Sequence, residues 1–86
     1  MVRRRPRVAV LGGDGRFRSE RLPGCTVRIF RARRYAGSRS LRDLERSIRA
    51  GGIDRVLILA RWNGHSTTRR VTSLCRKRNI PVEIIP

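Results

Sequence analysis

The chain has 86 residues, of which 22 are Lys or Arg and 6 are Asp or Glu, so its formal net charge is +16. This length makes one small domain and excludes a second, and the longest apolar run, residues 56–60, is too short to span a bilayer. We expect a soluble, cytoplasmic protein, because the N-terminus also lacks the apolar stretch of a secretory signal. The excess positive charge repels itself in so small a domain, and it therefore indicates a polyanionic partner, with nucleic acid as the first candidate.

The first seven residues are predicted to form a basic arm ahead of a single domain at residues 8–86. The arm carries three consecutive arginines: Arg3, Arg4 and Arg5. Residues 8–11 follow as an unbroken apolar run, which is typical of a strand buried on both faces of a parallel sheet. The connection over residues 13–24 has room for only a short helix, which we place around residues 17–22.

A second strand is predicted at residues 26–30, where Arg28 interrupts the apolar pattern, as suits a strand near the sheet edge. A helix follows this strand. Ser40 and Asp43 have the spacing of a capping box at its start, and the glycine pair at residues 51–52 stops it. The apolar residues of this helix share one face: Leu41, Leu44 and Ile48.

The third strand is predicted at residues 56–60, and its unbroken apolar pattern places it beside the first strand in the sheet centre. The last helix ends near Asn79 and Pro81, ahead of an edge strand at residues 82–85. This helix carries apolar residues at helical spacing: Val71, Leu74 and Cys75.

The two cysteines, Cys25 and Cys75, lie in apolar-patterned segments. They show neither the CxxC spacing nor the Cys/His spacing of a metal site. We therefore expect core thiols in a reducing compartment, without a disulfide, and we expect no metal and no cofactor.

These elements predict a small doubly wound, Rossmann-like α/β fold with a four-stranded parallel sheet and about three helices. Right-handed crossovers favour the strand order 2-1-3-4. The first helix then lies on one face of the sheet and the later two on the other. A single short helix leaves much of its face uncovered, so we expect a second copy of the chain to cover it, giving a homodimer.

The winding reverses between strands one and three, and open α/β sheets bind ligands at such a place. Glycines there let a ligand approach the backbone, and a helix start favours an anion. The predicted anion or nucleotide pocket comprises residues from both strand ends: Gly12, Gly13, Asp14, Gly15, Arg16, Arg61, Asn63, His65 and Ser66. The alternative is that these residues form glycine turns, with Asn63 or Ser66 as a helix cap. Arg18 stands where a dinucleotide loop has its third glycine, which disfavours a dinucleotide cofactor.

Several motifs of the chain are similar to those of a known family. They are the glycine pair at residues 12–13, His65, the spacing of Val71 and Cys75 behind it, and the basic run at residues 76–78 that leads to Pro81. Over residues 8–85 the chain resembles the small, uncharacterised bacterial Rossmann-like family known as domain of unknown function 2325. The resemblance implies a fold and a ligand pocket, but no established activity. In that family an acidic residue often stands where this chain has Arg61, so the resemblance implies a more cationic pocket here.

Arginines recur every three or four residues along the first long helix, and this spacing puts them in one stripe opposite the apolar face. The stripe comprises Arg39, Arg42, Arg46 and Arg49. The next helix adds basic residues on the same side of the sheet: Arg69, Arg70, Arg76, Lys77 and Arg78. A plain solvated helix face is the alternative, although such faces usually alternate in sign. Trp62 and Tyr35 are loop aromatics, which either stack on unpaired bases or fill the core.

Three functions stay open. The first is binding of DNA or RNA, mainly at the phosphate backbone, through the arginine stripe, the arm and Trp62. The second is a sensor or binding domain for a small anionic nucleotide in the predicted pocket. The third is a scaffold that docks onto an acidic protein or a ribonucleoprotein. A hydrolase or nuclease that uses Asp14 and His65 is a minority interpretation, because the chain has few carboxylates, and we expect no enzyme.

Overall fold

The structure is a computed structural model of the chain, and it describes residues 5–13, 22–31 and 39–86. Within these residues four strands form one parallel sheet: β1 (Arg7–Leu11), β2 (Thr26–Phe30), β3 (Arg55–Leu59) and β4 (Val82–Ile85). Their order is β2-β1-β3-β4, which confirms the predicted α/β fold and strand order. The two unbroken apolar runs are therefore neighbours in the sheet centre.

Strand β1 pairs with β2 on one side and with β3 on the other, and Val8, Ala9 and Val10 are buried. Side chains of a central strand lose water on both faces of the sheet, which is why an unbroken apolar run suits this position. The strand begins at Arg7, a residue that the sequence assigns to the arm. There the Arg7 backbone N–H donates to Asp54 Oδ2 at 2.7 Å, and this bond fixes the start of the strand.

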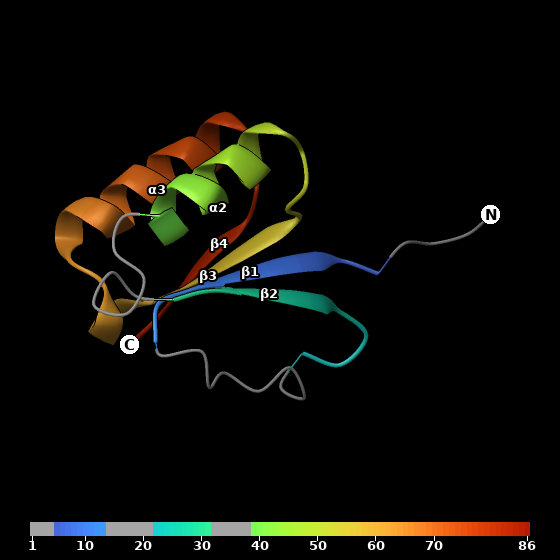
Figure 1. Ribbon diagram of the computed structural model, residues 1–86, viewed down its shortest axis with the longest axis horizontal. Coiled ribbons are helices and arrows are strands. Elements are labelled where there is room, and N and C mark those ends of the chain that lie inside the picture. Colours follow the sequence, from blue (N-terminus) through green and yellow to red (C-terminus); the bar gives the residue numbers. More distant parts are fainter. Residues whose placement is uncertain (1–4, 14–21, 32–38) are drawn as a thin grey trace.

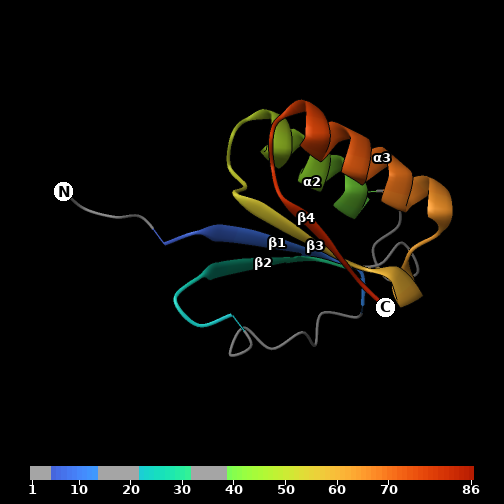
Figure 2. The ribbon, with the colours of Figure 1, turned by 180° about the vertical axis from the view of Figure 1, so that it is seen from behind.

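The two long helices, α2 (Arg39–Arg49) and α3 (His65–Lys77), lie side by side over one face of the sheet, as Figures 1 and 2 show from opposite sides. The sequence predicts this shared face. The short helix predicted around residues 17–22 falls almost wholly outside the described residues, which hold two α-helices and the one-turn 3-10 helix η2 (Ala60–Trp62). No helix in this part of the chain is long and apolar enough to cross a membrane.

The core between helices and sheet is made by the inner faces of α2 and α3. Four of their side chains are at most 1% exposed: Leu44, Ile48, Val71 and Cys75. They pack against the side chains of β1, β2 and β3 that point to the same face. Burial raises the pKa of the Cys75 thiol above its ordinary value of 9.0, and Cys25, also a free thiol, is partly buried on the other face of the sheet.

Both long helices end in backbone turns that the sequence marks. At the end of α2, Gly51 has a φ of +76°, and the N–H groups of residues 51 and 52 donate to carbonyls of the last turn. Asn79 takes the same position after α3, with a φ of 56°. The start of α2 differs from the prediction: the helix begins at Arg39, so Ser40 lies inside its first turn and does not precede it as a cap.

The other face of the sheet carries a second apolar cluster. Its centre is buried within the single chain, at Val8, Val10 and Leu57, while Leu59 and Ile85 are partly buried. The homodimer prediction depends on how much of this apolar face is left uncovered. The homodimer stays a prediction.

Candidate functional site

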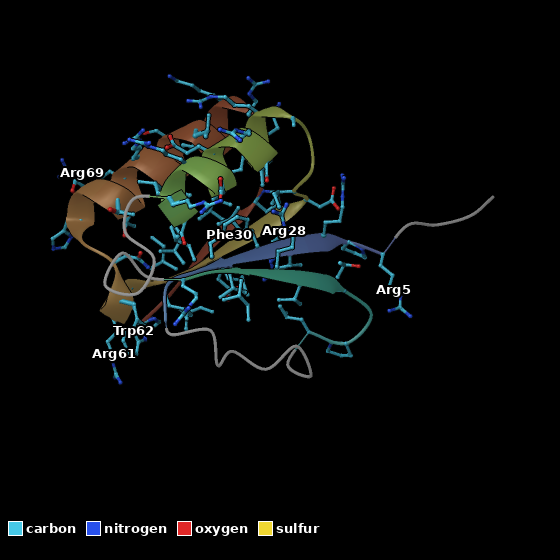
Figure 3. All side chains as sticks on the ribbon, in the orientation of Figure 1. Arg5, Arg28, Phe30, Arg61, Trp62 and Arg69 are labelled. Carbon is cyan, nitrogen blue, oxygen red and sulfur yellow. The ribbon has the colours of Figure 1, made fainter. Side chains whose placement is uncertain are left out.

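The outer side of the helix layer carries a dense group of exposed basic side chains, which we call the helix surface. They are Arg39, Arg42, Arg46 and Arg49 from α2, Arg69, Arg70, Arg76 and Lys77 from α3, and Arg78 directly after α3. Figure 3 shows Arg69 at the outer edge of α3. The structure brings the two predicted groups of basic residues together on adjacent helices.

One buried carboxylate holds the arginines between the two helices. The Glu45 side chain is only 5% exposed, and its two oxygens lie 2.9 Å from Arg70 Nη2 and 3.0 Å from Arg70 Nε. The Nη2 atom of Arg49 lies 3.9 Å from the same carboxylate. A guanidinium that bonds both oxygens of a carboxylate is fixed in direction as well as in distance. Glu45 therefore ties α2 to α3 and holds Arg49 and Arg70 together at the junction of the two helices.

Within the described residues, most of the helix surface has no acid to neutralise it. The other carboxylate of α2, Asp43, lies 4.0 Å from Arg39 in an exposed pair, a kind that contributes little to stability. Among the residues that the structure describes, no carboxylate pairs with the remaining members: Arg42, Arg46, Arg69, Arg76, Lys77 and Arg78. An anion that docks here relieves the repulsion between these cations.

A shallow hollow of about 320 Å³ lies in the middle of the helix surface. Its walls are basic apart from one carboxylate: Arg42, Arg46, Arg49, Arg70 and Glu45. Arginine is well suited to phosphate because its planar fork donates two parallel hydrogen bonds to phosphate oxygens. A phosphate placed in this hollow would meet guanidinium groups from both helices.

Several arginines elsewhere in the described chain are bound into the fold. The contacts join Arg7 to Asp54, Arg55 to Glu83, and Arg28 to the Phe30 ring, with the Arg28 guanidinium 5.0 Å from the ring centre (Figure 3). The Arg7 side chain donates to both carboxylate oxygens of Asp54, and this hydrogen bonding raises the pKa of Arg7. These cations already have partners within the protein, whereas Arg42 and Arg46 have no carboxylate partner in the described part of the chain.

The crevice predicted between strands β1 and β3 holds the side chain of Asn63. Its Nδ2 donates to the Leu11 carbonyl at 3.1 Å and to the Leu59 carbonyl at 2.8 Å, so it fastens the two strand ends together. Gly12 makes room for it, because a Cβ at residue 12 would lie 2.6 Å from this nitrogen. The Gly12 N–H donates to the Phe30 carbonyl at 2.9 Å. The backbone N–H of Gly12 and the side-chain amide of Asn63 therefore already donate hydrogen bonds within the protein.

The other residues of the predicted pocket are partly described. Gly13 is buried beside Gly12, while Arg61, His65 and Ser66 are exposed at η2 and the start of α3. Figure 3 shows Arg5 far from the labelled Arg61 and Trp62. Several predicted residues lie outside the described residues: Arg3, Arg4, Asp14, Gly15, Arg16 and Tyr35. The suggested pairing of Asp14 with His65 falls outside them as well.

A cavity of about 390 Å³ opens at the carboxyl ends of the strands, between the starts of α2 and α3. Asn63, Ser66 and Trp62 lie in its wall and were candidates from the sequence. Arg70 was a candidate for the helix surface but not for this cavity, and sequence reasoning missed the remaining members: Leu11, Arg31, Ser40, Leu41, Gly64 and Thr67. The predicted topology starts both helices at the same sheet edge, and this signal points to their first turns as part of the site.

Among the described residues, no group of three or more His, Cys, Asp or Glu side chains is placed to hold a metal ion. Comparisons of the chain with protein-family models, with curated proteins and with solved structures gave no match. The resemblance to the domain of unknown function therefore stays a prediction.

Proposed function

We propose that this chain binds nucleic acid through the helix surface, mainly by contacts to the phosphate backbone. One observation carries the proposal: basic side chains from two adjacent helices form one exposed surface on which only Asp43 and Glu45 supply carboxylates among the described residues, and both already pair with arginines. The charge left over lies on one side of the helix layer, where a polyanion can neutralise many cations at once.

The chemistry of the surface favours the backbone over the bases as its target. The exposed cations are almost all arginines, whose forked donors match phosphate oxygens. They belong to two helices that lie side by side (Figures 1 and 2), so the surface is broad and does not project as a single helix into a groove. Contacts of this kind give affinity that depends little on base sequence and strongly on salt.

The test compares two variants that lose the same charge from different places. Arg42→Gln/Arg46→Gln removes two arginines of the helix surface that pair with no carboxylate among the described residues, and Arg5→Gln/Arg61→Gln removes two exposed arginines outside it (Figure 3). Arg39, Arg49 and Arg70 are left intact because they pair with carboxylates, so the fold is not disturbed.

Binding is measured by fluorescence anisotropy with a labelled single strand and a labelled duplex at physiological salt. The helix-surface variant should lose about tenfold or more in affinity for both ligands, since each lost charged contact costs on the order of 1 kcal/mol. The control variant should lose much less. Equal losses in the two variants would mean that net charge alone drives binding, and this result would sink the proposal.

We also propose the cytoplasm as the compartment of the protein, because nucleic acid is accessible there and because free thiols such as Cys25 and Cys75 stay reduced in it. Fractionation of host cells that express the tagged chain tests this placement. Recovery of the chain from an oxidising compartment, with both cysteines oxidised, would contradict it. We also propose that the chain belongs to the family of domain of unknown function 2325, on the basis of the sequence motifs alone.

A further inference from the structure

The cavity between the starts of α2 and α3 is distinct from the hollow of the helix surface. Its volume of about 390 Å³ lies within the range of about 300–1,000 Å³ that ligand pockets occupy. Its wall comes from four segments, namely the end of β1, the residue after β2, the first turn of α2 and the chain from η2 into α3. Arg70 is the one residue that lines both sites.

The wall of the cavity attracts an anion. Arg31 and Arg70 lie in it, and no carboxylate does among the residues that the structure describes. Arg70 uses part of its guanidinium in the ion pair with Glu45, and its other N–H groups remain available for a ligand. Ser66 and Thr67 add hydroxyl groups.

The same wall has an aromatic and apolar part. Trp62 lies in it with 39% of its surface exposed, and Leu11 and Leu41 complete the apolar side. Indole rings stack well on nucleobases, and this stacking tolerates any base because every base has an aromatic face. A ligand that suits both parts of the wall carries a phosphate and a flat aromatic ring.

We infer that this cavity binds a nucleoside monophosphate, with the phosphate at Arg31, Ser66 and Thr67 and the base against Trp62. The inference does not rest on the proposed backbone binding, because it uses a different site. The same chemistry is present in a free nucleotide and at the phosphorylated end of a nucleic-acid strand, and the experiment separates these two sources.

Trp62 is the only tryptophan of the chain, so its fluorescence reports directly on the cavity. The full chain is titrated with AMP, with adenosine and with inorganic phosphate, and calorimetry gives the stoichiometry of AMP binding. AMP should produce a saturable change with one site per chain. Adenosine and inorganic phosphate, each matching only one part of the wall, should bind at least tenfold more weakly.

Arg31→Gln should weaken AMP binding at least tenfold, and Arg31→Lys should recover part of the loss because it keeps the charge. Arg31 also has an interaction within the protein, so circular dichroism spectra and melting temperatures are recorded to show that both variants keep the wild-type fold. Arg42→Gln/Arg46→Gln is the control; it removes two charges from the helix surface, one more than Arg31→Gln removes, and should still leave the affinity for AMP within twofold of wild type.

A competition experiment separates the free nucleotide from the phosphorylated strand end. It measures how well an oligonucleotide with or without a terminal phosphate displaces AMP. Stronger competition by the phosphorylated strand identifies a strand end, and competition by neither strand identifies the free nucleotide; both results support the inference. The absence of a saturable response at millimolar AMP would overturn it. An AMP affinity that survives in Arg31→Gln and disappears in Arg42→Gln/Arg46→Gln would overturn it too, because AMP would then sit on the helix surface.

Discussion

The inner and outer faces of the helix layer come from the same two helices, yet they differ in almost every property. The inner face is apolar and buried, with Leu44, Ile48, Val71 and Cys75 at most 1% exposed. The outer face is basic and exposed, and two of its arginines, Arg42 and Arg46, have no carboxylate partner among the described residues. Burial of the inner face stabilises the fold, whereas crowding of cations on the outer face opposes it. Stability and binding should therefore respond to different residues.

Leu44→Ala tests the inner face and has the largest expected effect. Its side chain is fully buried, so its truncation leaves a cavity and should lower the free energy of unfolding by about 2–5 kcal/mol. Urea unfolding followed by circular dichroism measures the change. Leu41→Ala removes the same atoms from a partly buried position of the same helix and should cost less. Equal costs at the two positions would contradict the placement of Leu44 at the centre of the core.

Cys75 sharpens the comparison through pH. Burial raises the pKa of this thiol above 9.0, so the folded protein keeps a proton that the unfolded chain has already lost. Stability should be full below about pH 9 and should fall above it, by up to about 1.4 kcal/mol per pH unit. Cys75→Ala should lack this component when unfolding is measured from neutral to alkaline pH. Parallel curves for the two proteins would show that Cys75 does not titrate differently in the folded state.

Glu45 stands at the border of the two faces, so its change should act on both. Glu45→Gln keeps the shape but removes the charge that Arg49 and Arg70 share. Both arginines are more than half exposed, so water replaces part of the interaction and the loss of stability should be about 1 kcal/mol. Nucleic-acid affinity should rise several-fold, because the freed arginines can turn to phosphate.

Asp43→Asn is the charge-matched control for Glu45→Gln. It removes one carboxylate from the same helix, but its pair with Arg39 is exposed, so stability should change by less than about 0.5 kcal/mol. Unfolding and anisotropy measurements on both variants complete the test. Weaker nucleic-acid binding by Glu45→Gln would show that the ion pair positions Arg49 and Arg70 for the ligand, and the account of a freed surface would be wrong.

The outer face alone is expected to give the smallest change in stability. Arg42→Gln/Arg46→Gln should raise the free energy of unfolding slightly, by no more than about 0.5 kcal/mol, because two charges that repel their neighbours are removed. Urea unfolding without nucleic acid at low salt measures it. A clear loss of stability would place these arginines among those that hold the fold together.

Much of the fold follows from the sequence because its signals are local. The unbroken apolar runs at residues 8–11 and 56–60 identify the central strands, and the handedness of crossovers then sets the strand order. Gly51 and Asn79 mark the helix ends, since both have positive φ angles in the structure. The start of β1 was harder to place because Arg7 belongs to the strand through a carboxylate far along the chain, Asp54.

The candidate sites are less predictable because they depend on which side chains meet across elements. The residue spacing in the sequence places Glu45 among the arginines of α2. It does not reveal that this carboxylate is buried and pairs with Arg70 on α3. From the sequence, Asn63 is equally compatible with a role in ligand binding and with a role as a helix cap. In the structure its side chain donates to the carbonyls of two strand ends. Arg31 carries no motif, and only the folded chain brings it into the cavity wall.

The most direct test of the central claim is the salt dependence of binding to duplex DNA. The logarithm of the affinity should fall linearly with the logarithm of the salt concentration, with a slope of about −0.9 for each phosphate that the protein neutralises. Arg42→Gln/Arg46→Gln should make this slope shallower by about 2 units, and Arg5→Gln/Arg61→Gln should leave it unchanged within error. The same slope for wild type and both variants would show that the helix surface is not the footprint of the nucleic acid.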